Sequence, residues 1–340
     1  MIRVLIVDDS AFMRQVVSDI INNDPDLEVI DTASNGLIAI DKVAQLRPDV
    51  ILMDVEMPKM DGLSALSSIM KSNPTPVVML SNLTQKGTYT TIKALEIGAV
   101  DFISKPSGSL SLDIDTISAQ IVEKVKLAAK VNSNTTQPGR TSSLPRVEMK
   151  NSTKVIVIGA STGGPQTLVE LLKRLPRNVP PIFIVQHMPA EFTKSLASRL
   201  DSICIFDVKE AEEGDMIRPG MAFLAPGGYH MTVKRTRLDN KDIIQLNTNP
   251  PVNSIRPSVD VTMQSVVDVY GANTIGVLLT GMGHDGAKGM CSIKKSGGKT
   301  IAQNEETCVI FGMPKSAIEK GCVNKVAPVS SIPEEIMNML

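Results

Sequence analysis

The sequence predicts an α/β protein with two domains, each built on a mainly parallel, doubly wound sheet. The chain has 340 residues, long enough for two domains that each bury a hydrophobic core. Short apolar runs alternate with segments of helical spacing, which is the pattern of β–α repeats. A polar segment, residues 132–145 (NSNTTQPGRTSSLP), interrupts this alternation. It has almost nothing to bury, so we expect a flexible linker between the domains.

The first domain contains five apolar runs that we expect to form strands. They cover residues 4–7, 27–33, 50–53, 77–80 and 101–104. The segments between them, such as residues 11–22, place apolar residues three and four positions apart, as amphipathic helices do. The same spacing predicts a last helix that ends near residue 130. We assign residues 1–125 to this domain and residues 126–153 to the helix end and the linker.

The composition is that of an ordinary globular protein, with 42% hydrophobic and 21% charged residues. The net charge of −1 favours neither nucleic acid nor an anionic membrane as a partner. The first apolar run is too short for a signal peptide, and no stretch approaches the ~20 residues that span a bilayer. We therefore expect a cytoplasmic protein. Its four cysteines form no C-x-x-C pair, so we expect reduced thiols and neither a zinc site nor a disulfide framework.

Charged and polar residues follow the expected strands of the first domain. Asp8 and Asp9 end the first strand, Asp54 the third, Ser81 the fourth and Lys105 the fifth. The carboxyl ends of parallel strands meet at one edge of the sheet, so the three carboxylates would lie together and repel one another. A hard divalent cation such as Mg²⁺ would relieve that repulsion. Asp54 could then accept a phosphoryl group, with Ser81 bonding the phosphoryl oxygen and Lys105 offsetting its charge.

The second domain begins with the segment VIGASTGGP, which has two interpretations. Gly159, Ser161 and Gly164 have the spacing of a dinucleotide-binding loop, but Ser161 replaces the glycine that lets a pyrophosphate approach the backbone. The next strand also ends in Gln186 rather than in the acid that binds a ribose. Gly159, Ser161 and Gly163 alternatively form G-x-S-x-G, which exposes a nucleophilic serine at a sharp turn before a helix. We favour the nucleophile.

A nucleophilic serine needs a base, and the chain offers three histidines. His187 ends a strand at the expected sheet edge, His230 opens an alternating segment that suggests a surface hairpin, and His284 lies in a glycine-rich loop. We favour His187, with Asp285 after the strand at 274–280 as the acid that orients it. A second set stays open: Ser161 as nucleophile, Asp260 as acid and His284 as base follow the chain order that is usual in α/β-hydrolases.

Four motifs in the first domain, LIVDDS, ILMDVEMPKMDG, VVMLS and DFISKP, resemble the receiver domain of bacterial response regulators. The resemblance covers residues 1 to about 125 and implies a flavodoxin-like (βα)₅ fold. It further implies that a histidine kinase phosphorylates Asp54, and that Asp8, Asp9 and Asp54 hold Mg²⁺.

The same resemblance assigns Ser81, Phe102 and Lys105 to the switch that senses phosphorylation. Phe102 stands where this family often has tyrosine, so one hydroxyl contact of the usual switch is missing. The Lys105–Pro106 peptide bond is expected to be cis.

Six motifs in the second domain, IGASTGGP, VQHMP, LAPGGYHM, IRPSVD, LLTGMGHDGAKGM and FGMP, resemble the catalytic domain of the chemotaxis protein-glutamate methylesterase (CheB) family. The resemblance runs from about residue 154 to residue 340. It implies that Ser161 is the nucleophile, His187 the general base and Asp285 its orienting partner. The backbone N–H of Met282 would stabilise the oxyanion, and Thr162 would line the same pocket.

The family resemblance also implies partners. The substrates would be glutamyl methyl esters, and also glutamines, on the cytoplasmic helices of methyl-accepting chemoreceptors, so the enzyme would meet the membrane only through receptors. The phosphodonor would be the chemotaxis histidine kinase, no cofactor would serve ester hydrolysis, and we expect a monomer.

Three other functions compete with this one. A receiver without output chemistry and a DNA-binding regulator are disfavoured by the second domain, which shows a serine motif and no basic recognition helix. A serine hydrolase of small esters is the closest enzymatic rival, and turnover of methylated receptor against that of a small ester would distinguish the two. We also expect the unphosphorylated receiver to cover the Ser161 site and to release it on phosphorylation.

Overall fold

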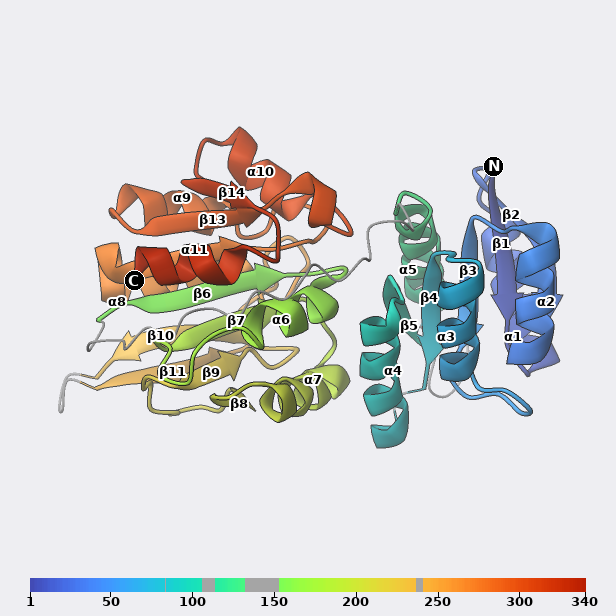
Figure 1. Ribbon diagram of the computed structural model, residues 1–340, viewed down its shortest axis with the longest axis horizontal. Coiled ribbons are helices and arrows are strands. Elements are labelled where there is room, and N and C mark those ends of the chain that lie inside the picture. Colours follow the sequence, from blue (N-terminus) through green and yellow to red (C-terminus); the bar gives the residue numbers. More distant parts are fainter. Residues whose placement is uncertain (83, 106–113, 132–152, 237–240) are drawn as a thin grey trace. The chain divides into compact units, whose positions relative to one another are not determined.

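The chain folds into two compact units, Met1–Gln137 and Pro138–Leu340. The computed structural model describes residues 1–82, 84–105, 114–131, 153–236 and 241–340 (Figure 1). The expected linker and the Lys105–Pro106 peptide bond lie outside the described residues.

The first unit is a five-stranded parallel sheet in the order β2-β1-β3-β4-β5. Its strands are β1 (Ile2–Val7), β2 (Leu27–Ala33), β3 (Val50–Asp54), β4 (Val77–Ser81) and β5 (Asp101–Ser104). All five predicted strands are confirmed. The central strands β3 and β4 are buried along their whole length, because helices cover both faces of the sheet.

Five helices cover this sheet. They are α1 (Ala11–Asn22), α2 (Gly36–Leu46), α3 (Gly62–Ser72), α4 (Gln85–Ile97) and α5 (Ile114–Ala128). α1 packs beside α5, while α3 lies between α2 and α4. The first four helices begin where a side chain accepts a hydrogen bond from a free backbone N–H, at Ser10, Asn35, Asp61 and Thr84. α5 ends at Ala128, close to the predicted end near residue 130.

The second unit is a seven-stranded parallel sheet with a separate hairpin, in agreement with the predicted fold class. The strand order is β14-β13-β12-β6-β7-β9-β8. The strands are β6 (Val155–Ala160), β7 (Ile182–Gln186), β8 (Asp207–Glu210), β9 (Met221–Leu224), β12 (Thr274–Leu278), β13 (Lys299–Gln303) and β14 (Lys325–Ala327). The antiparallel hairpin consists of β10 (His230–Arg235) and β11 (Asp242–Asn247).

Helices lie on both faces of this larger sheet (Figure 1). They are α6 (Gly164–Leu172), α7 (Ala190–Ile203), α8 (Val259–Tyr270), α9 (Ala287–Lys295), α10 (Met313–Glu319) and α11 (Ile332–Met339), with 3₁₀ turns at Gly271–Asn273 and Glu305–Thr307. One core cluster joins the sheet to α8, α9, α10 and the hairpin, through residues such as Phe183, Phe223, Met231 and Met263. α6 packs against α7 and α11, which lie in front of the sheet in Figure 1.

The strand order of the second sheet reverses at β6. The chain moves from β6 to β7 on one side and later returns to place β12 on the other side. In an open parallel sheet, ligands bind beyond the carboxyl ends of the strands at such a reversal. The ends of β6, β7 and β12 are therefore the expected place for a site.

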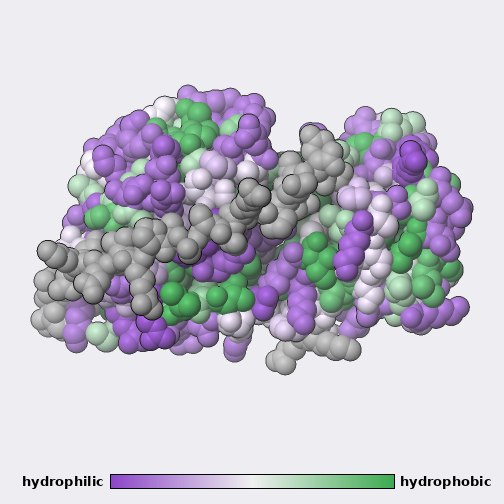
Figure 2. Space-filling view, in the orientation of Figure 1, coloured by the Kyte–Doolittle hydropathy of each residue, from purple (hydrophilic) through white to green (hydrophobic). Residues whose placement is uncertain are grey.

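The surface is mixed in polarity. On the face drawn in Figure 2, hydrophilic residues cover much of each unit and hydrophobic residues form scattered patches. Among the described helices, none combines the length and the apolar character needed to cross a bilayer.

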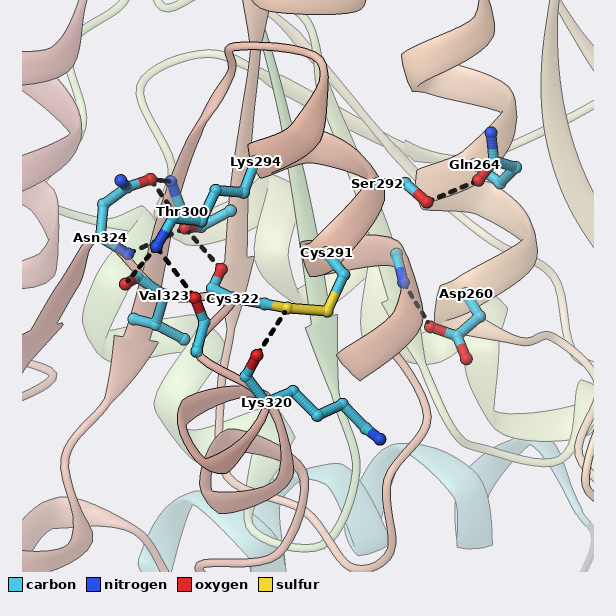
Figure 3. Close-up of a disulfide and its surroundings, with 12 residues drawn as sticks. Asp260, Gln264, Cys291, Ser292, Lys294, Thr300, Lys320, Cys322, Val323 and Asn324 are labelled. Atoms are coloured by element: carbon cyan, nitrogen blue, oxygen red, sulfur yellow. Dashed lines mark hydrogen bonds between the residues drawn. A yellow bond between two sulfur atoms is a disulfide. The ribbon is translucent and has the colours of Figure 1, made fainter.

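The prediction of reduced thiols is wrong for two of the four cysteines. Cys291 on α9 and Cys322 after α10 form a disulfide across a sequence separation of 31 residues, with their Cα atoms 4.7 Å apart (Figure 3). Cys204 and Cys308 are free. The sequence did not indicate the pair because the two cysteines meet only where α9 packs on α10. Asn324 and Thr300 hold the adjacent segment to β13 by hydrogen bonds of 2.9 Å.

Candidate active site and phosphoacceptor site

Ser161 lies in the sharp turn between β6 and α6. Gly163, the residue before α6, has φ of +76°, a conformation that favours glycine. A Cβ atom at Gly163 would overlap Val309, and one at Gly159 would overlap Val259. The glycines of G-x-S-x-G therefore serve the turn and the close packing around it. The N-terminus of α6 follows directly, which favours negative charge near Ser161.

His187 follows β7, the neighbour of β6. Ala160 and Gln186, the last residues of the two strands, pair in the sheet. Ser161 and His187 are therefore the first residues after the ends of adjacent strands. The His187 N–H donates to the Ala160 carbonyl at 3.1 Å, and the Gln186 side-chain amide donates to the carbonyls of Ser161 and His187. Gln186, which stands where a dinucleotide-binding domain would have an acidic residue, thus fixes the backbone of both residues.

Asp285 reaches the same place from the loop after β12. Its Oδ2 lies 2.8 Å from Nε2 of His187, and its side chain is 1% exposed. Four further donors surround the carboxylate, namely Ser258 Oγ and the N–H groups of Val259, Asp260 and Gly286. Burial raises the pKa of Asp285, but the hydrogen bond from His187 and the backbone donors outweigh it, so the net shift of the pKa is downward. Asp285 is therefore a stable anion beside the imidazole.

The end of β12 also borders Ser161. The Ser161 N–H donates to the Thr280 carbonyl at 3.0 Å, and Thr280 Oγ1 donates to the Thr162 carbonyl at 3.0 Å. Met282, two residues further on, is 40% exposed. Within the described part of the chain, its backbone N–H donates no hydrogen bond. That N–H is available to an oxygen atom of a substrate.

The second set of candidates is not assembled. Asp260 is buried and accepts a hydrogen bond from the Gly289 N–H, whereas His284 is exposed in the loop before Asp285. No hydrogen bond joins Asp260 to His284 among the described residues. Burial, with the neighbouring charge of Asp285, raises the pKa of Asp260, which does not favour it as the anionic partner of a histidine.

Ser258, which the sequence reasoning did not consider, and His230, which it considered only as a candidate base in a surface hairpin, are linked to Asp285. Ser258 caps α8 and donates to Asp285, and its N–H donates to His230, which is 1% exposed. The prediction of a hairpin at β10 is confirmed, but His230 is not on its surface, because α8 packs against β10. The motif IRPSVD, which contains Ser258, was the available signal.

The first unit brings its acidic residues together as predicted. Ligand oxygens of Asp8, Asp9 and Asp54 lie within 4.8 Å of one another. Lys105 Nζ lies 2.7 Å from Asp8 and 2.8 Å from Asp54. Asp54 Oδ1 is buried without a hydrogen-bond partner. Three carboxylates with one unsatisfied oxygen match the oxygen ligands that Mg²⁺ takes in proteins.

Burial raises the pKa of Asp54, although Lys105 opposes the shift. An ionised Asp54 is therefore costly here without additional positive charge, which again agrees with a cation at this site.

Of the three predicted switch residues, Lys105 lies in the acidic site, and Ser81 and Phe102 are buried. Ser81 is 0% exposed and receives a hydrogen bond of 2.6 Å from Thr91 on α4. Phe102 is 5% exposed, and Lys124 Nζ lies 5.2 Å from its ring centroid. Ser81 is thus hydrogen-bonded to α4.

Together, the two units define a class of protein: a domain with a receiver-type acidic site, followed by an α/β hydrolase domain in which His187 is hydrogen-bonded to Asp285 beside the turn that carries Ser161. Residues 4–113 match the response regulator receiver domain, and residues 156–336 match the family described as CheB methylesterase. The chain belongs to the CheB methylesterase family.

Similar proteins span the whole chain. A Pyrococcus abyssi protein named protein-glutamate methylesterase/protein-glutamine glutaminase is 51% identical, over 99% of this chain and 93% of its own length. A Thermotoga maritima protein of the same name is 47% identical, over 100% and 98%. The crystal structure of the Thermotoga maritima CheB methylesterase catalytic domain matches with a TM-score of 0.54 and 46% identity, over 56% of this chain and all of that one.

Proposed function

We propose that this chain hydrolyses glutamyl methyl esters of chemoreceptors, with glutamine deamidation as a second activity, under the control of phosphorylation at Asp54. The observation that carries the proposal is the 2.8 Å hydrogen bond between His187 and Asp285 at the strand end next to Ser161. Full-length relatives named protein-glutamate methylesterase/protein-glutamine glutaminase support the choice of substrate.

Ser161 is the nucleophile and His187 the base. Because Nε2 of His187 is hydrogen-bonded to Asp285, Nδ1 is the ring nitrogen that can accept the proton of Ser161. Ser161 Oγ attacks the ester carbonyl, and the negative oxygen that forms is stabilised by the Met282 N–H and by the N-terminus of α6. Thr162 lines the same pocket.

The intermediate then collapses. The methoxy group leaves as methanol with the proton from His187, and Ser161 stays acylated. His187 next takes a proton from water, which attacks the acyl carbonyl, and Ser161 Oγ leaves with that proton. Asp285 holds the imidazole and stabilises its charged form. With a glutamine substrate, ammonia replaces methanol.

The receiver supplies the control. Asp8, Asp9 and Asp54 would hold Mg²⁺, which, when bound, offsets the charge of an incoming phosphoryl group. Asp54 accepts that group from the chemotaxis histidine kinase, and Lys105 pairs with the charge that results. Ser81, which is hydrogen-bonded to α4, and Phe102, which lies on β5, couple phosphorylation to a change in the conformation of these elements.

Methanol release from methylated receptor tests this function. The wild-type chain is expected to release methanol, and Ser161→Ala to lose activity by about 10³-fold or more while remaining folded. A higher kcat/KM for a small methyl ester than for methylated receptor would instead favour a hydrolase of small esters. Near-normal turnover by folded Ser161→Ala would reject the nucleophile.

A further inference from the structure

His230 is a buried histidine whose two ring nitrogens both have backbone partners. It is the first residue of β10 and is 1% exposed. The Ser258 N–H donates to Nδ1 at 3.2 Å, and Nε2 lies 3.2 Å from the Pro250 carbonyl oxygen. Nδ1 must be unprotonated to accept from an N–H, and Nε2 must carry the proton to donate to a carbonyl. The ring is thus a neutral bridge with one defined tautomer.

The residue that His230 holds is the cap of α8. Ser258 is 0% exposed, and its Oγ donates to Asp285 Oδ1 at 2.9 Å. The next two residues also donate to Asp285 through their N–H groups, Val259 at 2.7 Å and Asp260 at 3.1 Å. Three of the donors that surround Asp285 therefore come from one helix start, and His230 accepts a hydrogen bond from the first backbone N–H of that start.

The hairpin does not need His230 to stay attached to α8. Thr262 Oγ1 donates to the Met231 carbonyl at 2.7 Å, and the Val233 N–H donates to Ser265 Oγ at 3.1 Å. Met231 and Val233 also belong to the hydrophobic core. These contacts lie further along α8, whereas the contact of His230 is directed at the cap itself.

We propose that His230 is a positioning residue for hydrolysis: it fixes Ser258, which fixes Asp285, which orients His187. The inference rests on the proposed function, because it assigns His187 and Asp285 their roles there. His230 has no part in proton transfer. Its contribution is to keep the donors of the α8 start aimed at the Asp285 carboxylate.

Two variants separate this role from a general contribution to folding. In His230→Asn, the amide oxygen takes about the place of Nδ1 and can still accept from the Ser258 N–H. In His230→Gln, the amide takes about the place of Nε2, keeps the contact with Pro250 and loses the acceptor for Ser258. Each variant loses one hydrogen bond, so we expect similar melting temperatures for the two.

Their turnover is expected to differ. His230→Gln should lower kcat for methylated receptor by about 10²-fold, with KM within about twofold, because small displacements of a catalytic group have large effects. His230→Asn should recover most of that loss, to within about threefold of wild type. Thr232→Val is a matched control, since it removes a hydrogen bond within the hairpin and does not touch Ser258. Equal kcat values for the Asn and Gln variants would overturn the inference.

NMR spectroscopy tests the same inference without measuring enzyme turnover. The chain has three histidines, so ¹⁵N-histidine labelling gives a spectrum that can be assigned by substitution. The downfield proton of the His187–Asp285 hydrogen bond should persist in His230→Asn and be lost or broadened in His230→Gln. If it is unchanged in both variants, the inference fails. If it changes as expected while wild type releases no methanol from methylated receptor, the inference holds and the proposed substrate is wrong.

Discussion

The disulfide between Cys291 and Cys322 should stabilise the second unit by a measurable amount. It closes a loop with a sequence separation of 31 residues. Restricting a loop of that length in the unfolded chain corresponds to about 3–4 kcal/mol of unfolding free energy. For a unit of this size, such a loss lowers the melting temperature by roughly 10 °C. The Cys291→Ala/Cys322→Ala double variant, or reduction of wild type, should therefore lower the melting temperature of the second unit by about this much.

Thiol titration and calorimetry check this together. Wild type denatured without reductant should show two reactive thiols, and four after reduction, because Cys204 and Cys308 remain free. Burial raises the pKa of both free thiols to about 12, so they contribute little thiolate for exchange at neutral pH.

Cys204→Ala serves as the matched control for this prediction. Its melting temperature should still respond to reductant, while that of the double variant should not. Four thiols in unreduced protein would show that the disulfide is absent. A change from two thiols to four without a change in melting temperature would refute the energetic argument.

Four further predictions concern the two sites and the control by the receiver. His187→Ala should reduce esterase activity about as severely as loss of Ser161, and a severe loss in His284→Ala alone would reassign the base. Asp54→Asn should abolish labelling by a small phosphodonor with Mg²⁺; persistent label would place the acceptor elsewhere. Because the pKa of Asp54 is raised, its stabilising contribution is present below the unfolded value of 3.8 and is lost as the pH rises through the folded pKa. At pH 7 without Mg²⁺, Asp54→Asn should therefore raise the melting temperature of the receiver, and a lower one would contradict the sign. Residues 147–340 alone should hydrolyse methylated receptor faster than the unphosphorylated full chain, and phosphodonor should accelerate only the full chain; a slower fragment would exclude simple occlusion by the receiver.

The sequence by itself determined the strands and the edge at which both sites lie. Runs such as 50–53 are apolar at every position because a parallel strand is buried on both faces, and that pattern is local. Since parallel strands present their carboxyl ends at one edge, the position of Asp54 after its run also predicted its neighbours Asp8 and Lys105. The same reasoning placed Ser161 next to His187, whose roles in catalysis stay predictions.

Only the tertiary structure decided which distant groups meet. The Cys291–Cys322 pair, the donation of Ser258 to Asp285 and the burial of His230 each join elements that are far apart in the chain. An alternating segment predicts a hairpin correctly, yet it cannot show which face α8 will cover, and that packing is what turns His230 inward. Contacts of this kind depend on how whole helices pack on the sheet, and no local spacing of residues carries that information.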